Sequence, residues 1–168
     1  LHARPSARIA YVMTDGAGLP MAMSDLVVAM RPHLATTITA GHAFGGDLEA
    51  VNVPSALVAA HHVAGADVAV VGMGPGVVGT ATKLGYSALE VGAVLGATSL
   101  LGGRPVAALR FSLADPRLRH QGVSHHTTTA LSLCSEARAT LGVPRGPFES
   151  CVRADLDGVG VSYRHRIL

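Results

Sequence analysis

The chain has 168 residues, of which 49% are apolar and 14% charged, with a formal net charge of +2. This length supports one domain with a proper core, and the apolar content excludes a solvated, disordered chain. The small charge, with no basic stripe that alternates with aromatic residues, argues against nucleic acid as a partner. No apolar run approaches the roughly 20 residues of a membrane helix, so we expect no membrane span. Two cysteines outside any CxxC motif fit a reducing cytoplasm.

The first half of the chain predicts strands and helices in alternation. We expect strands over residues 7–14, 36–40 and 67–71, and helices from about Pro20 to Pro32 and from about Pro54 to Ala64. Proline suits the first turn of a helix, and a later proline ends it. The run 67–71 is continuously apolar, which is typical of a central strand covered on both faces.

The alternation continues through the second half. In order, we expect a glycine-rich loop over 72–85, a helix from Ser87 to about Leu101, a strand over 105–112, a polar loop over 114–124 and a helix over about 125–141. Residues 145–168 form an extension that is hard to assign. We expect a turn at 155–158 and a late strand at 159–163 there.

This order predicts one α/β domain over residues 1–168. Its architecture is a three-layer α/β/α sandwich with a mainly parallel, Rossmann-like sheet of four to six strands. Right-handed crossovers place every strand-to-helix loop at one edge of such a sheet, where ligands bind. We therefore expect Asp15, His42, Lys83 and His120 to surround a common cleft.

The glycine-rich loop is a candidate anion site. Gly74, Gly76 and Gly79 form a GxGxxG pattern, and Thr80 and the only lysine, Lys83, follow. Backbone N–H groups at such glycines approach a phosphate or carboxylate closely. A dinucleotide site also needs an acidic residue about 20 positions on, which is missing here. A tight loop and an ordinary surface lysine are the alternatives, while an active lysine would serve as base, nucleophile or anion ligand.

The segment 119–129 concentrates polar side chains in an otherwise apolar chain. It contains Arg119, Ser124 and three histidines, His120, His125 and His126. Such groups are costly to bury without partners. If Ser124 caps the following helix, its free N–H groups and Arg119 make an anion pocket. The alternative is a solvated loop before a capped helix.

A metal site is a further alternative for this segment. Its ligands would be His42, His120 and one of the two adjacent histidines, for which we take His126. Neighbouring residues on a helix point about 100° apart, so we expect only one of His125 and His126 to join.

Two carboxylates complete the set of candidate proton-transfer groups. Asp47 and Asp115 lie in loops at the predicted sheet edge, as do Asp15 and Glu49. Either of the first two would work with His120 or His125 as acid and base. Turn formation is the alternative for both, because aspartate opens turns.

Three long motifs carry a family resemblance. They are residues 41–53, beginning Gly41-His42-Ala43-Phe44-Gly45-Gly46-Asp47, residues 72–85 with the GxGxxG loop, and residues 110–127 with Asp115-Pro116-Arg117 and the histidines. They resemble the bacterial domain-of-unknown-function family 3866, from the first strand to about Leu133. Members of that family are longer, which implies that this chain is a carboxyl-terminal portion. The resemblance implies no activity and assigns no residue a role.

The functional expectation follows from the clustered polar loops. We expect a cytoplasmic enzyme that binds a small anionic metabolite through Lys83, Arg119 and the glycines, with the proton-transfer groups named above. A non-catalytic metabolite-binding or regulatory module, or a histidine-ligated metal protein, are the alternatives. The cofactor stays open, and the low-charge composition is compatible with a homodimer.

Overall fold

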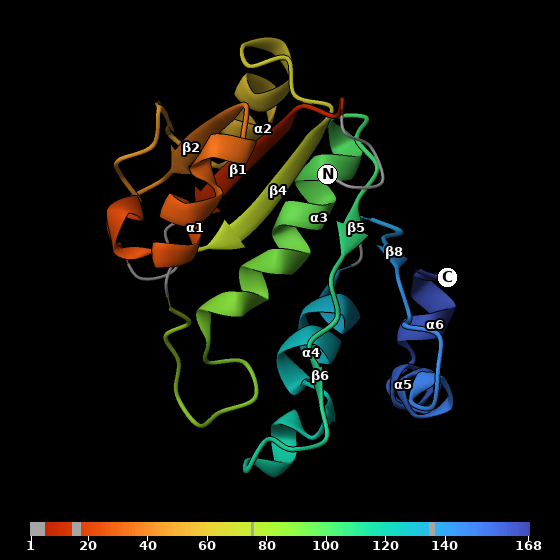
Figure 1. The fold of residues 1–168 in the computed structure, drawn as a ribbon. Helices are drawn as coiled ribbons and strands as arrows, with labels where there is room; N and C mark the ends of the chain where they lie inside the picture. The colour runs from red at the N-terminus through yellow and green to blue at the C-terminus, as the bar shows by residue number, and fades with distance from the viewer. Residues whose placement is uncertain (1–5, 15–17, 75, 135–136) are drawn as a thin grey trace. The chain divides into compact units, whose positions relative to one another are not determined.

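A computed structural model describes residues 6–14, 18–74, 76–134 and 137–168 of the chain (Figure 1). Its internal contacts divide the chain into two compact units, the first ending at Thr80 and the second beginning at Ala81. Each unit is described by itself, and a single domain over residues 1–168 stays a prediction. Within the described ranges, no helix has both the length and the apolar character needed to cross a membrane.

A four-stranded parallel sheet forms the centre of the first unit. Its strands are β1 (Ile9–Thr14), β2 (Thr36–Ala40), β3 (Leu48–Ala50) and β4 (Val68–Met73). They lie in the order β3-β2-β1-β4, and every pair of neighbours is parallel. The chain therefore has the predicted α/β fold with a mainly parallel sheet.

Helices cover both faces of this sheet, because side chains alternate between its faces along each strand. Ala10 and Val12 of β1 are buried in one apolar cluster with Ala56 and Ala60 of α2 (Val53–His62). On the other face, buried residues of β1, α1 (Asp25–Met30) and the 3₁₀ turn η1 (Met21–Met23) pack together, namely Met13, Met21 and Val27. Figure 1 shows the resulting three layers, with the sheet between α1 and α2.

The two predicted helices of this unit differ in outcome. The helix predicted from Pro54 is confirmed as α2, which begins with a capping box between Asn52 and Ser55. The helix predicted from Pro20 to Pro32 is broken into η1, α1 and a second 3₁₀ turn, η2 (Arg31–His33). Ser24 separates the first two, because its side chain accepts a hydrogen bond from the Val27 N–H and so starts a new helix.

The strand predicted to be central is instead an edge strand. β4 pairs only with β1 in the four-stranded sheet, and Val68 and Val70 are 47% and 49% exposed. An apolar run indicates a strand but does not fix its place in the sheet. The prediction of a β4 covered on both faces is therefore wrong.

The connection between β2 and β3 is short for two parallel strands, which normally need a dozen or more connecting residues. Leu48 lies opposite Ile38, so residues 41–47 must bring the chain back to the start of β3. Asp47 holds this loop by accepting hydrogen bonds from the N–H and hydroxyl of Thr37, at 2.8 Å each. No pattern in the sequence predicts β3.

The second unit consists of helices and short strands. The helices are α3 (Glu90–Leu100), α4 (His125–Leu133), α5 (Glu149–Gly158) and α6 (Val161–Arg164), with 3₁₀ turns η3 (Ser87–Leu89) and η4 (Leu118–His120). The strands β5 (Val106–Ala107), β8 (Thr140–Leu141) and β9 (Arg166–Ile167) form a parallel sheet, and β6 (Phe111–Ser112) pairs with β7 (Gly122–Val123) antiparallel. Its core includes Leu131, Leu141, Val152 and Leu156.

Several predictions for this unit are wrong. The strand over 105–112 is two short strands in separate small sheets, so it does not extend the four-stranded sheet. The helix from 125 ends at Leu133, and the turn at 155–158 belongs to α5. Where a late strand over 159–163 was expected, residues from Val161 onward form α6. The apolar residues near 141 belong to a buried strand. In a short stretch of sequence, a buried strand and a buried helix have the same apolar pattern.

This topology removes the premise of the common cleft. Loops meet at one edge only if their strands share one sheet, and the strands of the second unit do not join β1 to β4. Lys83 and His120 belong to the second unit and His42 to the first. Asp15 lies outside the described residues.

Gly46 tests the tight return from β2 to β3. A Cβ atom there would lie 2.8 Å from the backbone nitrogen of Thr39 and from the carbonyl oxygen of Leu48. We expect Gly46→Ala to lower the free energy of unfolding by about 1–3 kcal/mol, because backbone must move to admit the methyl group. Urea denaturation measures this change. The control is Gly76→Ala, where no described atom lies within 4 Å of the added Cβ. An equal loss of stability in both variants would show that close backbone contacts at Gly46 are not the cause.

Candidate functional site

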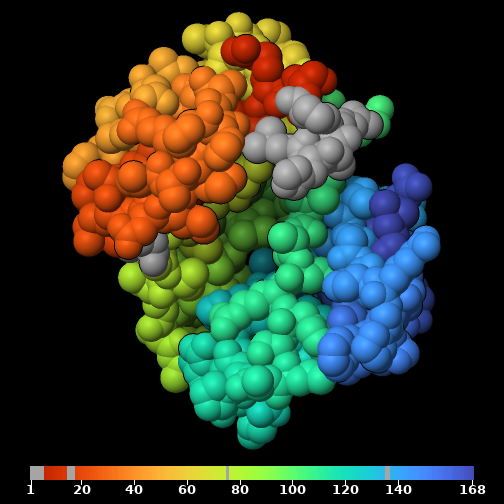
Figure 2. Space-filling view, viewed as in Figure 1, coloured from red at the N-terminus to blue at the C-terminus, as the bar shows by residue number. Residues whose placement is uncertain are grey.

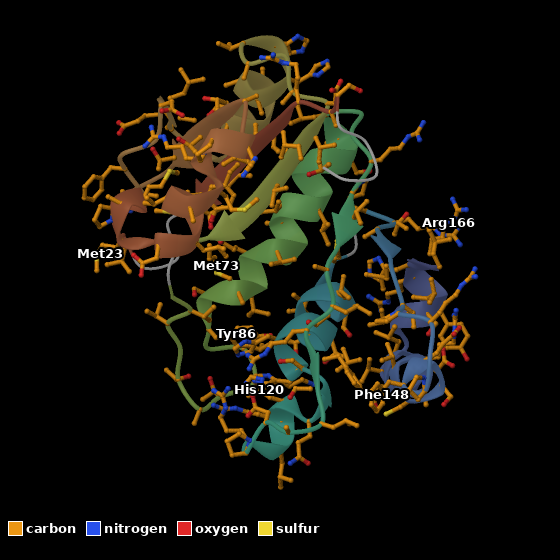
Figure 3. All side chains as sticks on the ribbon, in the orientation of Figure 1. Met23, Met73, Tyr86, His120, Phe148 and Arg166 are labelled. Carbon is orange, nitrogen blue, oxygen red and sulfur yellow. The ribbon has the colours of Figure 1, made fainter. Side chains whose placement is uncertain are left out.

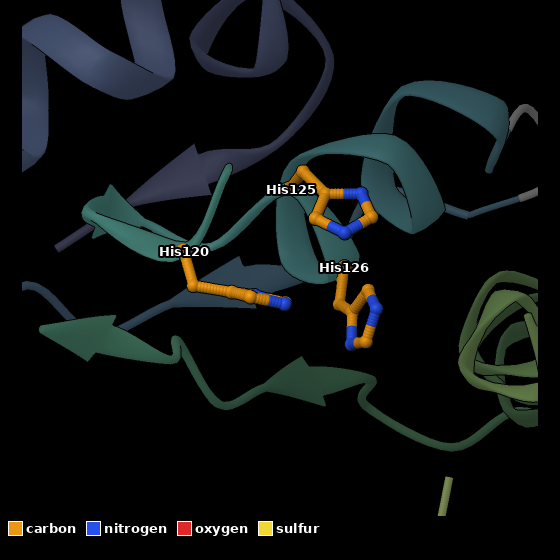
Figure 4. Close-up of side chains that lie close together, drawn as sticks. All are labelled: His120, His125 and His126. Atoms are coloured by element: carbon orange, nitrogen blue, oxygen red, sulfur yellow. The ribbon is translucent and has the colours of Figure 1, made fainter. Parts of the chain in front are cut away.

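Three histidine side chains converge in the second unit. His120 ends η4, and His125 and His126 open α4. One ring nitrogen from each lies within 4.8 Å of the others. The ring centroids are 4.9 Å apart for His120 and His125, 4.8 Å for His120 and His126, and 4.4 Å for His125 and His126. Figure 4 shows the three rings turned toward a common space.

Ser124 connects this cluster to the start of α4. As predicted, it caps the helix, and its hydroxyl oxygen accepts a hydrogen bond from the His126 N–H at 3.3 Å. The same oxygen lies 2.7 Å from Nδ1 of His120. Ser124 is fully buried and His120 is 1% exposed, so both groups keep these positions. One hydroxyl thus fixes the helix end and the His120 ring together.

Two ring nitrogens of the cluster are buried without a protein partner. Within the described chain, Nε2 of His120 and Nε2 of His125 have no hydrogen-bond partner and no appreciable exposed surface. Buried polar atoms are normally paired, so each such atom calls for an explanation such as an ion or a water molecule. Because Nδ1 of His120 is paired with Ser124, its Nε2 is the atom left for a ligand.

Tyr86 forms a wall of the cluster. Its ring stacks on His126 at a centroid distance of 4.2 Å and an interplanar angle of 19°, and it meets His125 edge-on at 5.3 Å. Figure 3 shows Tyr86 and His120 in the same part of the second unit. Tyr86 is 7% exposed, and burial raises the pKa of its phenol. The ring therefore restricts both adjacent histidines.

The strand β7, paired with β6, connects His120 to Ser124 along the chain. Gly122 of β7 has a φ of +70°, and the following N–H, that of Val123, donates to Oδ2 of Asp155 in α5 at 2.8 Å. A Cβ atom at Gly122 would collide with the Asp155 carboxylate. A residue without a side chain is therefore required here. This contact ties α5 to the segment that carries the site.

The environment favours the neutral form of the three imidazoles. Burial lowers the pKa of His120, and the cation of Arg117 lowers it further. Burial also lowers the pKa of His125, with a contribution from Arg119. For His126, burial and the neighbouring His125 lower the pKa to about 4. A neutral imidazole has a lone pair, which a metal ligand needs.

Arginines surround the cluster, with one carboxylate among them. Asp115 accepts hydrogen bonds from Arg110 at 2.9 Å and from Arg117 at 3.0 Å, and its side chain is 8% exposed. The hydrogen bonds from Arg117 hold the pKa of Asp115 well below its usual range. Figure 2 shows the green-to-teal segment that contains these residues at the surface of the unit. A carboxylate held in this way accepts a proton reluctantly, so its predicted role as a base gains no support.

The remaining predicted residues lie elsewhere. Lys83 is exposed in the loop before η3, and Arg119 is exposed in η4 beside the histidines. The other candidates belong to the first unit: His42, Asp47, Gly74, Gly76, Gly79 and Thr80. Of these, Asp47 is engaged by Thr37 and also by Arg31. Its hydrogen bonds from Thr37 lower its pKa, which fits the alternative that it shapes a turn.

The structure changes the composition of the predicted metal set. The cluster contains both His125 and His126 together with His120, whereas His42 lies in the other unit. Both adjacent histidines therefore belong to the cluster, whereas the sequence led us to expect only one of them in a metal site. Cβ directions differ by about 100°, but an imidazole extends far enough from the first helical turn for both rings to reach a point beyond its end. Sequence reasoning missed Tyr86 and Asp155, which no local pattern distinguishes from core and surface residues.

Comparison with known proteins gives a family but no activity. A family model described as "Protein of unknown function (DUF3866)" matches residues 1–168, the whole chain. No curated protein matches the chain, and no solved structure matches it. The chemistry of the site therefore depends on its own residues.

The lowered histidine pKa values predict acid sensitivity. Because folding lowers these pKa values below the ordinary 6.5, the unfolded chain binds more protons between about pH 6.5 and pH 4. Stability is thus present above pH 6.5 and is lost as the pH falls through this window. We expect a His126→Gln variant to have a shallower loss in chemical denaturation at pH 7.5, 6, 5 and 4. His62→Gln, exposed on α2, is the control, and identical pH slopes for all three proteins would count against this assignment.

Removal of the Ser124 hydroxyl should weaken the fold. Ser124→Ala deletes the cap of α4 and leaves Nδ1 of His120 buried without its partner. We expect a loss of about 1–3 kcal/mol in the free energy of unfolding, measured by urea titration. Ser99→Ala, at an exposed position of α3, is the control and should change little. A Ser124→Ala protein as stable as the parent would show that the hydroxyl does not hold the two elements.

Proposed function

The chain belongs to the DUF3866 family of proteins of unknown function, and we propose that it binds a divalent transition metal through His120, His125 and His126. The metal would serve an enzyme that acts on a small anionic substrate. The observation that carries the proposal is the convergence of three imidazoles with two buried, unpartnered Nε2 atoms among the described residues.

The donor set fits zinc in particular. Zinc takes imidazole nitrogens at about 2.0–2.1 Å in tetrahedral sites, so two such nitrogens on one ion lie roughly 3.3 Å apart. The three nitrogens lie within 4.8 Å of one another, so a bound zinc ion would draw them closer together than they lie here. Three histidines leave the fourth position to a water molecule or a substrate, as in catalytic rather than structural zinc sites. A bound metal would supply an activated water or polarise a substrate oxygen there.

Ser124 has the place of an outer partner in such a site. A histidine that ligates a metal usually donates its other N–H to an oxygen, which fixes the tautomer and the ring orientation. The 2.7 Å contact between Nδ1 of His120 and the Ser124 oxygen supports this arrangement, with Nε2 as the ligand atom. We accordingly assign Ser124 a positioning role.

The surrounding charge favours an anion as the further ligand. Arg110 and Arg117 share the single carboxylate of Asp115, so this group of three residues carries a net positive charge. Arg119 is exposed beside it and contributes to the lowered pKa of His125. With a divalent ion bound to neutral histidines, the site is strongly cationic, and a phosphate- or carboxylate-bearing metabolite would be attracted to it. Lys83 and the glycines of the first unit stay predictions as anion ligands.

The sheet of the first unit supports a related part of the proposal. Its strand order, β3-β2-β1-β4, is that of the first strands of Rossmann-like sheets, although a loop rather than a helix connects β2 and β3. We therefore retain a Rossmann-like fold for this unit as a proposal. We also propose a cytoplasmic location, which the two free cysteines, Cys134 and Cys151, support. A homodimer stays a prediction.

Metal binding tests the proposal directly. We expect tag-free protein to bind one zinc ion, measured by elemental analysis and by titration against a chromophoric chelator. Single replacements of His120, His125 or His126 by Ala should each weaken binding at least 100-fold, because each removes one of three ligands. The matched control is His61→Ala/His62→Ala, another adjacent pair with ring centroids 4.7 Å apart on α2. Equal affinity in parent and cluster variants would reject the site.

The open fourth position has its own test. Cobalt(II) in place of zinc gives visible absorption bands that depend on its ligands. We expect inorganic phosphate or acetate to shift these bands in the parent protein, because the anion would enter the open position. The exposed arginine provides a variant, Arg119→Gln, in which the anion should bind several-fold more weakly. If neither anion changes the absorption bands, the site is closed and structural, and the catalytic role is rejected.

A further inference from the structure

A small cavity opens beside the histidine cluster. It has a volume of about 110 Å³ and is lined only by residues of the second unit. Its walls come from the segments around η3 and α3, from the β5 region and from α4. The His126 side chain belongs both to this lining and to the three-histidine cluster. The cavity therefore adjoins the histidine cluster, with which it shares His126.

The lining is apolar and consists mostly of small side chains. Four alanines contribute to it: Ala88, Ala107, Ala108 and Ala130. Apart from His126 and Thr127, every lining residue is apolar, and none carries a permanent charge. Such walls cannot replace the hydration of a charged group, so burial of a charge there is unfavourable. Transfer of an alkyl group from water into the cavity is favourable. The chemistry of the cavity thus suits a hydrocarbon substituent.

The volume limits the size of that substituent. A cavity of about 150 Å³ lined by aliphatic residues takes up benzene. A volume of about 110 Å³ is smaller than this and holds an aliphatic chain of roughly three to five carbon atoms, straight or branched. Each methylene buried there strengthens binding about fourfold, which corresponds to ~0.8 kcal/mol.

We infer that the substrate carries a short aliphatic chain next to its anionic group, with the anion at the histidine cluster and the chain in the alanine-lined cavity. This inference rests on the proposed function, because it takes the anion to be bound at a metal held by His120, His125 and His126. The alanines determine specificity by leaving space that larger side chains would fill. Tyr86 stacks on His126 at 4.2 Å and so holds the ring that the cavity and the cluster share.

A series of alkyl hydroxamates on the zinc-loaded chain provides the test. Acetohydroxamate probes the metal alone, and longer members add one methylene at a time up to ten carbons. We expect affinity, measured by calorimetry, to rise about fourfold per carbon up to a chain of three to five carbons and then to level off. The chain length at which affinity stops rising indicates how many carbon atoms the cavity holds.

Two alanine variants separate the cavity from general effects. Ala108 lines the cavity and is exposed, so Ala108→Leu should fill the space without disturbing the core. We expect this variant to bind acetohydroxamate like the parent and to lose the dependence on chain length. Ala114→Leu, at an exposed alanine outside the lining, is the matched control and should retain that dependence.

The outcomes distinguish this inference from the proposed function. A protein that takes up no zinc overturns both. A protein that binds zinc and acetohydroxamate, but binds all chain lengths equally, overturns only the aliphatic substrate. If Ala108→Leu shows the same dependence of affinity on chain length as the parent protein, the cavity is not where the aliphatic chain binds.

Discussion

The hydroxyl of Ser124 both caps helix α4 and positions a histidine of the site. It accepts the N–H of His126 at the start of α4, and it meets Nδ1 of His120 across the preceding turn. The helix cap places both adjacent histidines at a free helix end, while the second contact orients the third. Because the group is fully buried, water does not replace either interaction. The three histidines can therefore converge only if α4 begins at His125, directly after its cap.

The sequence predicted the parallel core of the first unit because that core depends on local patterns. β1 and β4 are mainly apolar runs, β2 is a run of β-branched residues that ends in alanine, and α2 begins with a polar cap and a proline. β3 follows β2 without a helix and depends on Asp47, Thr37 and Gly46, whose contacts are tertiary. The edge position of β4 is likewise a property of the sheet and not of its strand.

The second unit was harder to predict for the same physical reason. Strands of two residues, such as β5 and β8, have no period that a sequence window can detect. The segment 119–129 is nevertheless predicted from the sequence to be a functional region, since so many polar groups in an apolar chain need partners. The partners themselves were missed. Tyr86 is distant in sequence, and the convergence of His125 with His126 depends on side-chain reach beyond the helix end.

The contact between the β7 hairpin and α5 extends the constraint to distant positions. Only glycine fits at residue 122 above the Asp155 carboxylate, and only an acceptor at 155 satisfies the N–H of Val123. A change at either position would therefore weaken this contact. Gly122 and Asp155 are expected to be conserved together across evolution, although the whole of α4 lies between them in the chain.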